Sequence, residues 1–284
     1  MIPTDDTGLA GPFGDELRAA ATLAGAAGDM VARLRLGTDA SLGVEMKPGD
    51  EPVTIADRAA SDLIVSGLSQ AFPSDVIISE ERADDPARVG ASRVWYVDPI
   101  DGTKDFIRGG EGFAVMIGLC VDGAPVMGVV HQPPGGRTFW ATPAGAWTQA
   151  PGGPPQRMHV SSVADPAHIR LVASKSHRTE TIDRVKEILG ISDELNIGSV
   201  GLKLCLIAMG ERDLYVNPWP KCKAWDTCAP EVILARAGGR LTDTHGAALR
   251  YDERSLGREQ GLIASNGLVH DSVVARLGAL FAKR

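Results

Sequence analysis

The sequence predicts a fold that combines helices and sheets, with a sheet-rich α+β first half joined to an α/β second half. Two observations carry this prediction. Short runs of β-forming residues dominate the first half, whereas strand-like and helix-like segments alternate in the second. Between them, Pro151-Gly152-Gly153-Pro154-Pro155 interrupts regular structure. A chain of 284 residues is long enough for two closely packed domains, and we expect them to be residues 1–159 and 160–284.

The first half is expected to begin with two helices and to continue with strands. Apolar side chains recur at helical spacing in residues 15–36 and in residues 57–71. The Asp122-Gly123 pair is typical of a hairpin turn between two of the strands that follow. The predicted strands are residues 76–79, 94–97, 114–121, 126–131 and 137–141.

The second half is expected to alternate strands with helices. Gly238-Gly239 ends one of these helices, since glycine is favoured after the last helical turn. The predicted strands are residues 169–173, 214–216 and 262–264, and the predicted helices are residues 179–189, 199–209, 226–237 and 268–281.

Composition excludes several functional classes. The net charge is −7 and no Lys/Arg run offers a surface for a nucleic-acid backbone. No apolar run of about eighteen residues predicts a membrane span, and the first residues do not resemble a signal peptide. Four scattered cysteines are typical of reduced thiols in a cytoplasmic protein, although Cys222 and Cys228 could pair.

The most informative segment is residues 95–106, in which a predicted strand runs into a turn. Asp98 and Asp101 lie three residues apart in this turn, and Pro99 stiffens the chain between them. Both carboxylates can then face one pocket, where the Ile100 carbonyl can join them. Ligands that are all oxygen suit Mg²⁺. An ordinary β-turn with Asp98 as a strand-end cap is the alternative interpretation.

Other acidic residues stand at the ends of predicted elements. Glu80 and Glu81 follow a predicted strand, and adjacent carboxylates repel unless a cation or solvent lies between them. Asp57 and Asp226 stand where two helices are expected to begin, so helix capping also explains them. None of these residues identifies a metal site alone, but their order and spacing together are specific.

A series of short motifs resembles the signature of the inositol monophosphatase superfamily. In chain order they are Asp57, Glu80-Glu81, Asp98-Pro99-Ile100-Asp101-Gly102-Thr103, Trp225-Asp226 and Gly238-Gly239. These are Mg²⁺-dependent, lithium-sensitive phosphomonoesterases, among them inositol monophosphatases and 3′(2′),5′-bisphosphate nucleotidases. The resemblance spans roughly residues 47–243. It implies a layered αβαβα fold, inhibition by Li⁺ and, since relatives are often homodimers, a homodimer as one alternative.

The resemblance also implies the ligands of two Mg²⁺ ions. Glu80, Asp98 and the Ile100 carbonyl would hold the first ion. Asp98, Asp101 and Asp226 would hold the second. Two ions that share one carboxylate lie close together, as in-line phosphoryl transfer requires.

A third, weaker ion and the catalytic residues complete the implied site. The third ion would sit near Glu80 and Glu81. Asp57 and Thr103 would position and deprotonate the attacking water, so that with Glu80 they form the expected catalytic set.

Several features favour a nucleotide as the substrate. Lys104-Asp105-Phe106 and the segments around residues 174–177 and 198–203 are similar to those of bacterial bisphosphate nucleotidases. A loop that carries Trp219, Lys221 and Lys223 could close over a base and a phosphate, although Trp219 could instead fill the core below the site. The expected substrate contacts are Gly102, Thr103, Lys104, Ser174, Lys175, Ser176, His177, Ser199, Lys203 and Lys223. The alternative is that Lys104 and Lys203 are solvated lysines and that His177 is a helix-capping or surface histidine.

The sequence therefore predicts hydrolysis of the 3′-phosphate of 3′-phosphoadenosine 5′-phosphate to give AMP. The partner is a small phosphorylated molecule, with neither nucleic acid nor membrane. An inositol monophosphatase or another sugar-phosphate phosphatase is the first alternative. A non-catalytic interaction protein of the same fold is the second.

Overall fold

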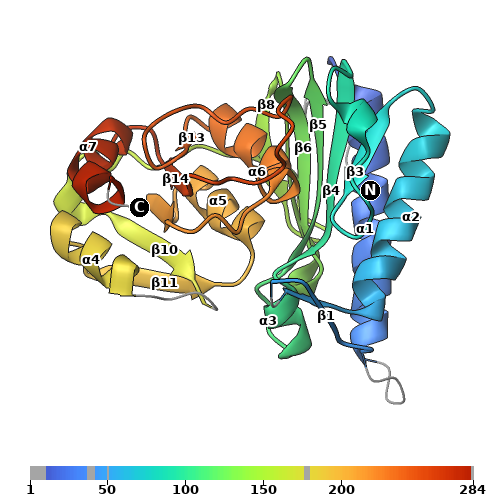
Figure 1. The fold of residues 1–284 in the computed structure, drawn as a ribbon, viewed down its shortest axis with the longest axis horizontal. Coiled ribbons are helices and arrows are strands. Elements are labelled where there is room, and N and C mark those ends of the chain that lie inside the picture. Colours follow the sequence, from blue (N-terminus) through green and yellow to red (C-terminus); the bar gives the residue numbers. More distant parts are fainter. Residues whose placement is uncertain (1–10, 37–41, 50, 176–179, 283–284) are drawn as a thin grey trace.

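Helices and sheets alternate in layers in the order αβαβα, as predicted (Figure 1). The structure is a computed structural model that describes residues 11–36, 42–49, 51–175 and 180–282. From one side to the other, the layers are α1 (Gly14–Leu36) with α2 (Ile55–Ala71), a seven-stranded sheet, α5 (Val200–Ala208) with α6 (Ala224–Arg236), a five-stranded sheet, and α4 (Glu180–Leu189) with α7 (His270–Phe281).

The seven-stranded sheet contains the strands predicted in the first half. Its order follows the chain from β3 to β9, with β3 and β4 parallel and the other pairs antiparallel. Asp122 and Gly123 both have positive φ, which confirms the predicted hairpin turn. The strands are β3 (Val76–Ser79), β4 (Arg93–Asp101), β5 (Ala114–Val121), β6 (Ala124–Gln132), β7 (Arg137–Thr142), β8 (Gly145–Gln149) and β9 (Gln156–Arg157).

The five-stranded sheet has the order β11-β10-β12-β14-β13. Its two edge strands, β11 and β13, were not predicted, because each is short and contains polar residues that weaken the strand pattern. The boundary near residue 160 falls between the two sheets and stays a prediction. The strands are β10 (Arg170–Ser174), β11 (Asp193–Ile197), β12 (Leu214–Asn217), β13 (Arg240–Thr242) and β14 (Leu262–Ser265).

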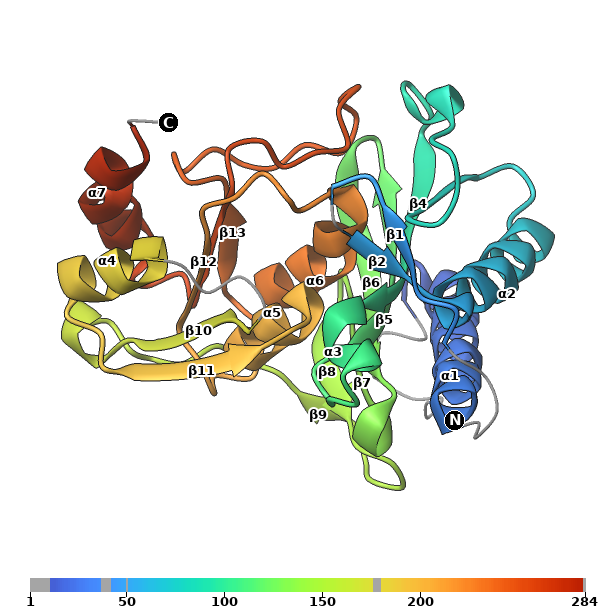
Figure 2. The ribbon, with the colours of Figure 1, turned by 60° about the horizontal axis from the view of Figure 1, so that its bottom comes forward.

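A small hairpin and a short helix, α3 (Thr103–Ile107), lie near each other beside the seven-stranded sheet (Figure 2). The hairpin consists of β1 (Glu45–Lys47) and β2 (Glu51–Val53), and the sequence patterns did not predict it. Three short 3₁₀ helices complete the described elements: η1 (Pro86–Arg88), η2 (Pro134–Gly136) and η3 (Pro166–His168).

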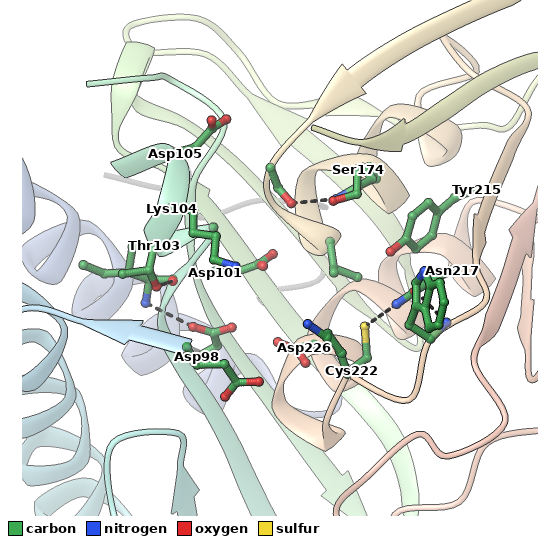
Figure 3. Close-up of a pocket in the computed structure, with 18 of the residues that line it drawn as sticks. Asp98, Asp101, Thr103, Lys104, Asp105, Ser174, Tyr215, Asn217, Cys222 and Asp226 are labelled. Atoms are coloured by element: carbon green, nitrogen blue, oxygen red, sulfur yellow. Dashed lines mark hydrogen bonds between the residues drawn. The ribbon is translucent and has the colours of Figure 1, made fainter. Parts of the chain in front are cut away.

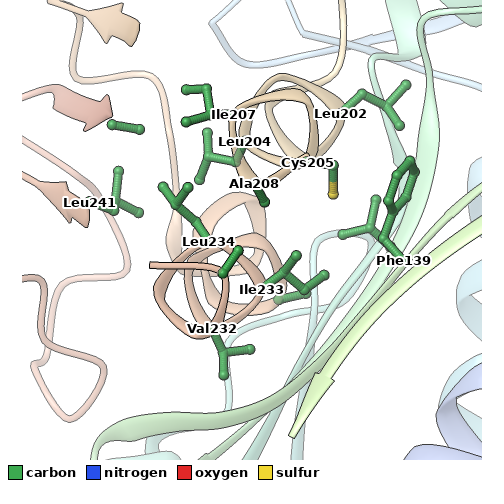
Figure 4. Packing of buried hydrophobic residues seen from close by; sticks show 14 of the residues in the cluster. Phe139, Leu202, Leu204, Cys205, Ile207, Ala208, Val232, Ile233, Leu234 and Leu241 are labelled. Carbon is green, nitrogen blue, oxygen red and sulfur yellow. The ribbon is translucent and has the colours of Figure 1, made fainter. Parts of the chain in front are cut away.

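Two glycines let α6 pack directly against the seven-stranded sheet. A Cβ atom on Gly128 would lie 2.5 Å from the Ala229 carbonyl oxygen, and one on Gly118 would lie 2.6 Å from the Cys228 sulfur. Such distances are shorter than atomic contacts allow, so only glycine fits under the helix. Side chains of α5 and α6 fill the space around this contact (Figure 4). The close packing sets the position of the N-terminal turn of α6.

Two further predictions concern membranes and cysteines. Within the residues that the structure describes, no helix has the length and apolar character needed to cross a membrane. The four cysteines are all buried and free, so Cys222 and Cys228 do not form a disulfide. Cys228 instead lies 3.4 Å from Cys120, sulfur to sulfur.

Candidate active site

A pocket of about 180 Å³ opens between the two sheets, and both halves of the chain line it (Figure 3). The end of β4 and the start of α3 form one wall. Residues at the end of β12, the loop after it and the N-terminal turn of α6 form the opposite wall. The β1–β2 hairpin contributes Glu51 and Pro52. Most of the residues predicted to carry chemistry therefore meet at one place.

Three carboxylates form the centre of this pocket. Asp98, Asp101 and Asp226 each place an oxygen within 4.8 Å of the other two. The pairing of β4 with β5 shifts in register between Asp98 and Asp101, and this irregularity accompanies the turn of both side chains toward the pocket. The Ile100 amide donates a hydrogen bond of 3.1 Å to Asp98 (Figure 3).

The electrostatics of these carboxylates fit a divalent cation. Burial, together with the charge of Glu80, holds the pKa of Asp98 well above its ordinary value. Burial and the charge of Asp101 raise the pKa of Asp226 to about 7. Negative charges crowded in this way repel one another until a cation neutralises them. The donor set is all oxygen, and hard ions such as Mg²⁺ prefer oxygen ligands.

Without divalent ions, the free energy of unfolding is expected to fall as pH rises from about 4.5 to about 8. Burial raises the pKa of Glu80 to about 8 and that of Asp226 to about 7. Across this window the folded chain retains protons that the unfolded chain has released, so stability decreases with pH. Excess Mg²⁺ favours the ionised carboxylates and is expected to remove the decrease. Thermal unfolding at several pH values, with EDTA or with Mg²⁺, measures both effects. A metal-free stability that increased across the window would contradict the prediction.

Glu80 and Glu81 share a cationic partner that sequence reasoning missed. The Lys47 ammonium group donates hydrogen bonds of 2.9 Å to Glu80 and 2.7 Å to Glu81. Lys47 lies in β1, more than thirty residues away in the sequence, and no local pattern marks it. Of these two glutamates, Glu80 lines the pocket. The positive charge thus stands beside residues that were predicted to bind the first and third metal ions.

The predicted pair of Asp57 and Thr103 is close in space. The Thr103 hydroxyl lies 3.3 Å from Asp57 Oδ1 and 3.0 Å from the Ile100 carbonyl oxygen. Asp57 Oδ2 accepts hydrogen bonds from the Thr54 amide and hydroxyl, at 2.8 and 2.5 Å. Asp57 is 1% exposed, and burial is the main cause that raises its pKa.

The interpretation of Asp57 and Asp226 as N-caps was wrong. Helix α2 begins at Ile55 with Thr54 as its cap, so Asp57 occupies the third position of the helix. Asp226 occupies the equivalent position in α6. The Lys223 amide donates a hydrogen bond of 2.6 Å to Asp226 Oδ2. In both helices the carboxylate reaches back to the capping residue, as in a capping box. One oxygen of each carboxylate is thereby fixed.

The predicted substrate contacts divide into groups. Gly102, Thr103, Lys104, Ser174 and Lys203 line the pocket, and Lys104 points into it (Figure 3). Lys175 forms an ion pair of 3.2 Å with Asp105. Neither Ser199 nor Lys223 is among the residues that line the described pocket. Ser176 and His177 lie outside the described residues.

The loop after β12, which was expected to close over a base and a phosphate, contributes residues that line the pocket. Asn217, Trp219 and Lys221 line the pocket, as does Tyr215 of β12. The cation that this loop provides is therefore Lys221 and not Lys223. The two lysines are two residues apart in a segment without helical or strand periodicity, so the sequence did not distinguish their directions.

Comparisons with known proteins show the family to which the chain belongs. A sequence model of the inositol monophosphatase family matches residues 15–280. The histidinol-phosphatase of Mycobacterium tuberculosis is 36% identical over 93% of this chain and 98% of that protein. The 3′(2′),5′-bisphosphate nucleotidase CysQ of Escherichia coli K12 is 36% identical over 82% of this chain and 92% of that protein.

Solved structures show the same architecture. The IMPase of Thermotoga maritima has a TM-score of 0.79 and 27% identity, covering 95% of this chain and 99% of that one. CysQ from Bacteroides thetaiotaomicron has a TM-score of 0.76 and 28% identity, covering 89% of this chain and 98% of that one. Since the family match covers nearly the whole chain, the chain belongs to the inositol monophosphatase family of phosphatases.

Proposed function

We propose that this chain is a Mg²⁺-dependent phosphomonoesterase whose leading substrate is 3′-phosphoadenosine 5′-phosphate. The observation that carries the reaction class is the group of three carboxylates, Asp98, Asp101 and Asp226, beside the Asp57–Thr103 pair. Water would add to phosphorus while the bond from phosphorus to the substrate oxygen breaks. The products would be AMP and inorganic phosphate.

The residues of the chain would divide the work of this reaction. Asp98, Asp101 and Asp226, with Glu80 and the Ile100 carbonyl, would hold the metal ions. Bound Mg²⁺ supplies positive charge that stabilises the attacking and leaving oxygens. The Thr103 hydroxyl, oriented by the Ile100 carbonyl and by Asp57, would position the attacking water. Asp57 would accept the proton of that water.

A nucleotide suits the remainder of the pocket. Trp219 supplies aromatic surface on the wall opposite Asp98 and Asp101, and an aromatic face can stack on a base. Lys104 and Lys221 supply positive charge for a second phosphate group. Trp219, Lys104 and Lys221 together support a substrate that carries both a base and a phosphate beyond the one that is hydrolysed.

Histidinol phosphate is a second candidate, because one observation favours a substrate that carries an amine. Glu51 lines the pocket without belonging to the central group of carboxylates, and an ammonium group needs an anionic partner. The relative from M. tuberculosis, which matches 93% of the chain, is a histidinol-phosphatase. Inositol phosphates and other sugar phosphates remain the third class to test.

Phosphate release should be measured from 3′-phosphoadenosine 5′-phosphate, histidinol phosphate, inositol 1-phosphate and fructose 1,6-bisphosphate, with Mg²⁺ and with or without Li⁺. We expect the highest kcat/KM for the nucleotide and inhibition by Li⁺. Lys221→Ala is expected to lower kcat/KM for the nucleotide about tenfold, the value of one charge-assisted hydrogen bond. Lys223→Ala, whose side chain is not among those lining the pocket, is the matched control and should match the wild type.

The outcomes separate the candidates. Preference for histidinol phosphate, with Lys221→Ala unchanged, would replace the nucleotide by the amine-bearing substrate and leave the metal chemistry intact. Absence of Mg²⁺-dependent release from all four compounds, together with absence of Mg²⁺ binding, would refute the enzymatic proposal and favour an interaction protein.

A further inference from the structure

The N-terminus of α5 holds one of the proposed metal ligands. Asp101 belongs to β4 of the seven-stranded sheet, whereas α5 lies in the middle helical layer, about a hundred residues later. The Ser199 hydroxyl donates a hydrogen bond of 2.5 Å to Asp101 Oδ2. The Gly201 amide donates a second, of 2.7 Å, to the same oxygen. Both donors therefore converge on one carboxylate oxygen.

Ser199 is fully engaged by these and other bonds. It is 0% exposed. Its hydroxyl also caps α5 by accepting a hydrogen bond of 3.0 Å from the Leu202 amide. The Ser199 amide donates a hydrogen bond of 2.8 Å to the Gly112 carbonyl oxygen, in the segment that leads into β5. With its polar groups bound within the protein and its surface covered, Ser199 has no group left to contact a substrate.

Lys203 holds the same segment from the next turn of α5. Its ammonium group donates a hydrogen bond of 2.7 Å to the Gly198 carbonyl oxygen and one of 2.9 Å to the Ser199 carbonyl oxygen. The ammonium also lies 5.2 Å from the ring centre of Tyr215. The side chain is 0% exposed, so its charge stays inside the protein, one helical turn from Ser199. Lys203 was expected to bind an anion of the substrate, but its hydrogen bonds go to the backbone that carries Ser199.

Close packing makes this arrangement sensitive to small displacements. A Cβ atom on Gly102 would lie 2.7 Å from the Gly112 carbonyl oxygen and 3.2 Å from the Ser199 amide nitrogen. A Cβ atom on Gly201 would lie 2.3 Å from the Met116 sulfur. Glycine at both positions lets the turn after Asp101 and the start of α5 approach each other closely enough for the hydrogen bonds to form.

We propose that Ser199 and the N-terminus of α5, held by Lys203, form a clamp that positions Asp101 for metal binding. The clamp uses Oδ2 and leaves Oδ1 for the ion. It also places two hydrogen-bond donors and the positive end of a helix beside the Asp101 carboxylate, which fixes the orientation of that carboxylate. Ser199 and Lys203 are therefore positioning residues and not substrate contacts. This inference rests on the proposed metal-dependent function.

The test is the Mg²⁺ dissociation constant, measured by isothermal titration calorimetry without substrate. Ser199→Ala is expected to weaken Mg²⁺ binding about tenfold, the low end of the effect of removing a residue that orients a metal ligand. Ser199→Thr retains the hydroxyl that bonds to Asp101 and is expected to bind Mg²⁺ more tightly than Ser199→Ala. At saturating Mg²⁺, the KM for the substrate should be unchanged in Ser199→Ala.

Ser265→Ala is the matched control for the loss of a buried serine. Ser265 is also 0% exposed and bonds to His270 at 2.9 Å, but it does not line the pocket. Both alanine variants are expected to melt at a somewhat lower temperature, whereas only Ser199→Ala should lose Mg²⁺ affinity. Folding of each variant is checked by circular dichroism before the titration.

Three results would overturn the clamp. Unchanged Mg²⁺ affinity in Ser199→Ala, with a raised substrate KM, would make Ser199 a substrate contact. If Ser199→Ala and Ser265→Ala weakened Mg²⁺ binding equally, the weakening would result from general destabilisation and not from the loss of the clamp. If the wild type itself bound no Mg²⁺, the proposed function would fail, a result distinct from the other two.

Discussion

Asp98→Asn is expected to lower kcat with the preferred substrate by about a thousandfold at saturating Mg²⁺. Asp98 stands at the centre of the carboxylate group, and the proposed arrangement makes it a ligand of both principal ions. An amide binds a hard cation more weakly than a carboxylate, because it has no net charge. Metal ions contribute several kcal/mol to catalysis of this kind, and about 4 kcal/mol corresponds to a thousandfold change in rate.

The same substitution is expected to stabilise the metal-free protein. Asp98 is 1% exposed and lies beside Glu80, Asp101 and Asp226, so removing its charge relieves repulsion. Lost activity with an unchanged or higher melting temperature would show that Asp98 serves the reaction and not the fold. Measurements are kcat across a Mg²⁺ titration and thermal unfolding in EDTA. Turnover within tenfold of the wild type would refute the metal mechanism.

Gly128→Ala is expected to destabilise the protein by about 3 kcal/mol, because overpacking against a rigid neighbour costs roughly 1–3 kcal/mol. The new Cβ would meet the Ala229 carbonyl oxygen at 2.5 Å, which is backbone and cannot rotate away. Helix α6 must then shift from the sheet. Since α6 carries Asp226 in its first turn, the variant is also expected to bind Mg²⁺ more weakly.

Gly25→Ala in α1 is the matched control for Gly128→Ala. A Cβ atom at Gly25 would have nothing within 4 Å, and alanine favours a helix over glycine by about 1 kcal/mol. This variant should therefore be at least as stable as the wild type, with unchanged Mg²⁺ affinity. Urea unfolding and calorimetric titration measure both quantities. If the two variants had equal stability, the contact between Gly128 and Ala229 would not limit the approach of α6.

The reaction class was predictable from sequence because its ligands are short-range features. Asp98 and Asp101 lie in one turn, and Glu80 follows a strand that pairs with β4. Asp57 and Asp226 lie in the first turns of helices, and the layered order of elements brings Asp226 into the pocket and Asp57 next to Thr103, which lines it. Hydrophobic periodicity predicted most of these elements, since helices and strands bury one face each. Periodicity did not distinguish the N-cap residue of a helix from the third residue of that helix.

Sequence by itself therefore determined the family, the layered fold and which carboxylates we propose as metal ligands. Only the tertiary structure decided which cationic side chains and hydroxyl groups form hydrogen bonds with these carboxylates. Lys47 reaches Glu80 and Glu81 from a distant hairpin, and Ser199 reaches Asp101 across the boundary between two layers. The direction of a side chain depends on the packing of elements far apart in the chain, and no local pattern encodes it. For the same physical reason, Lys221 and not Lys223 faces the pocket.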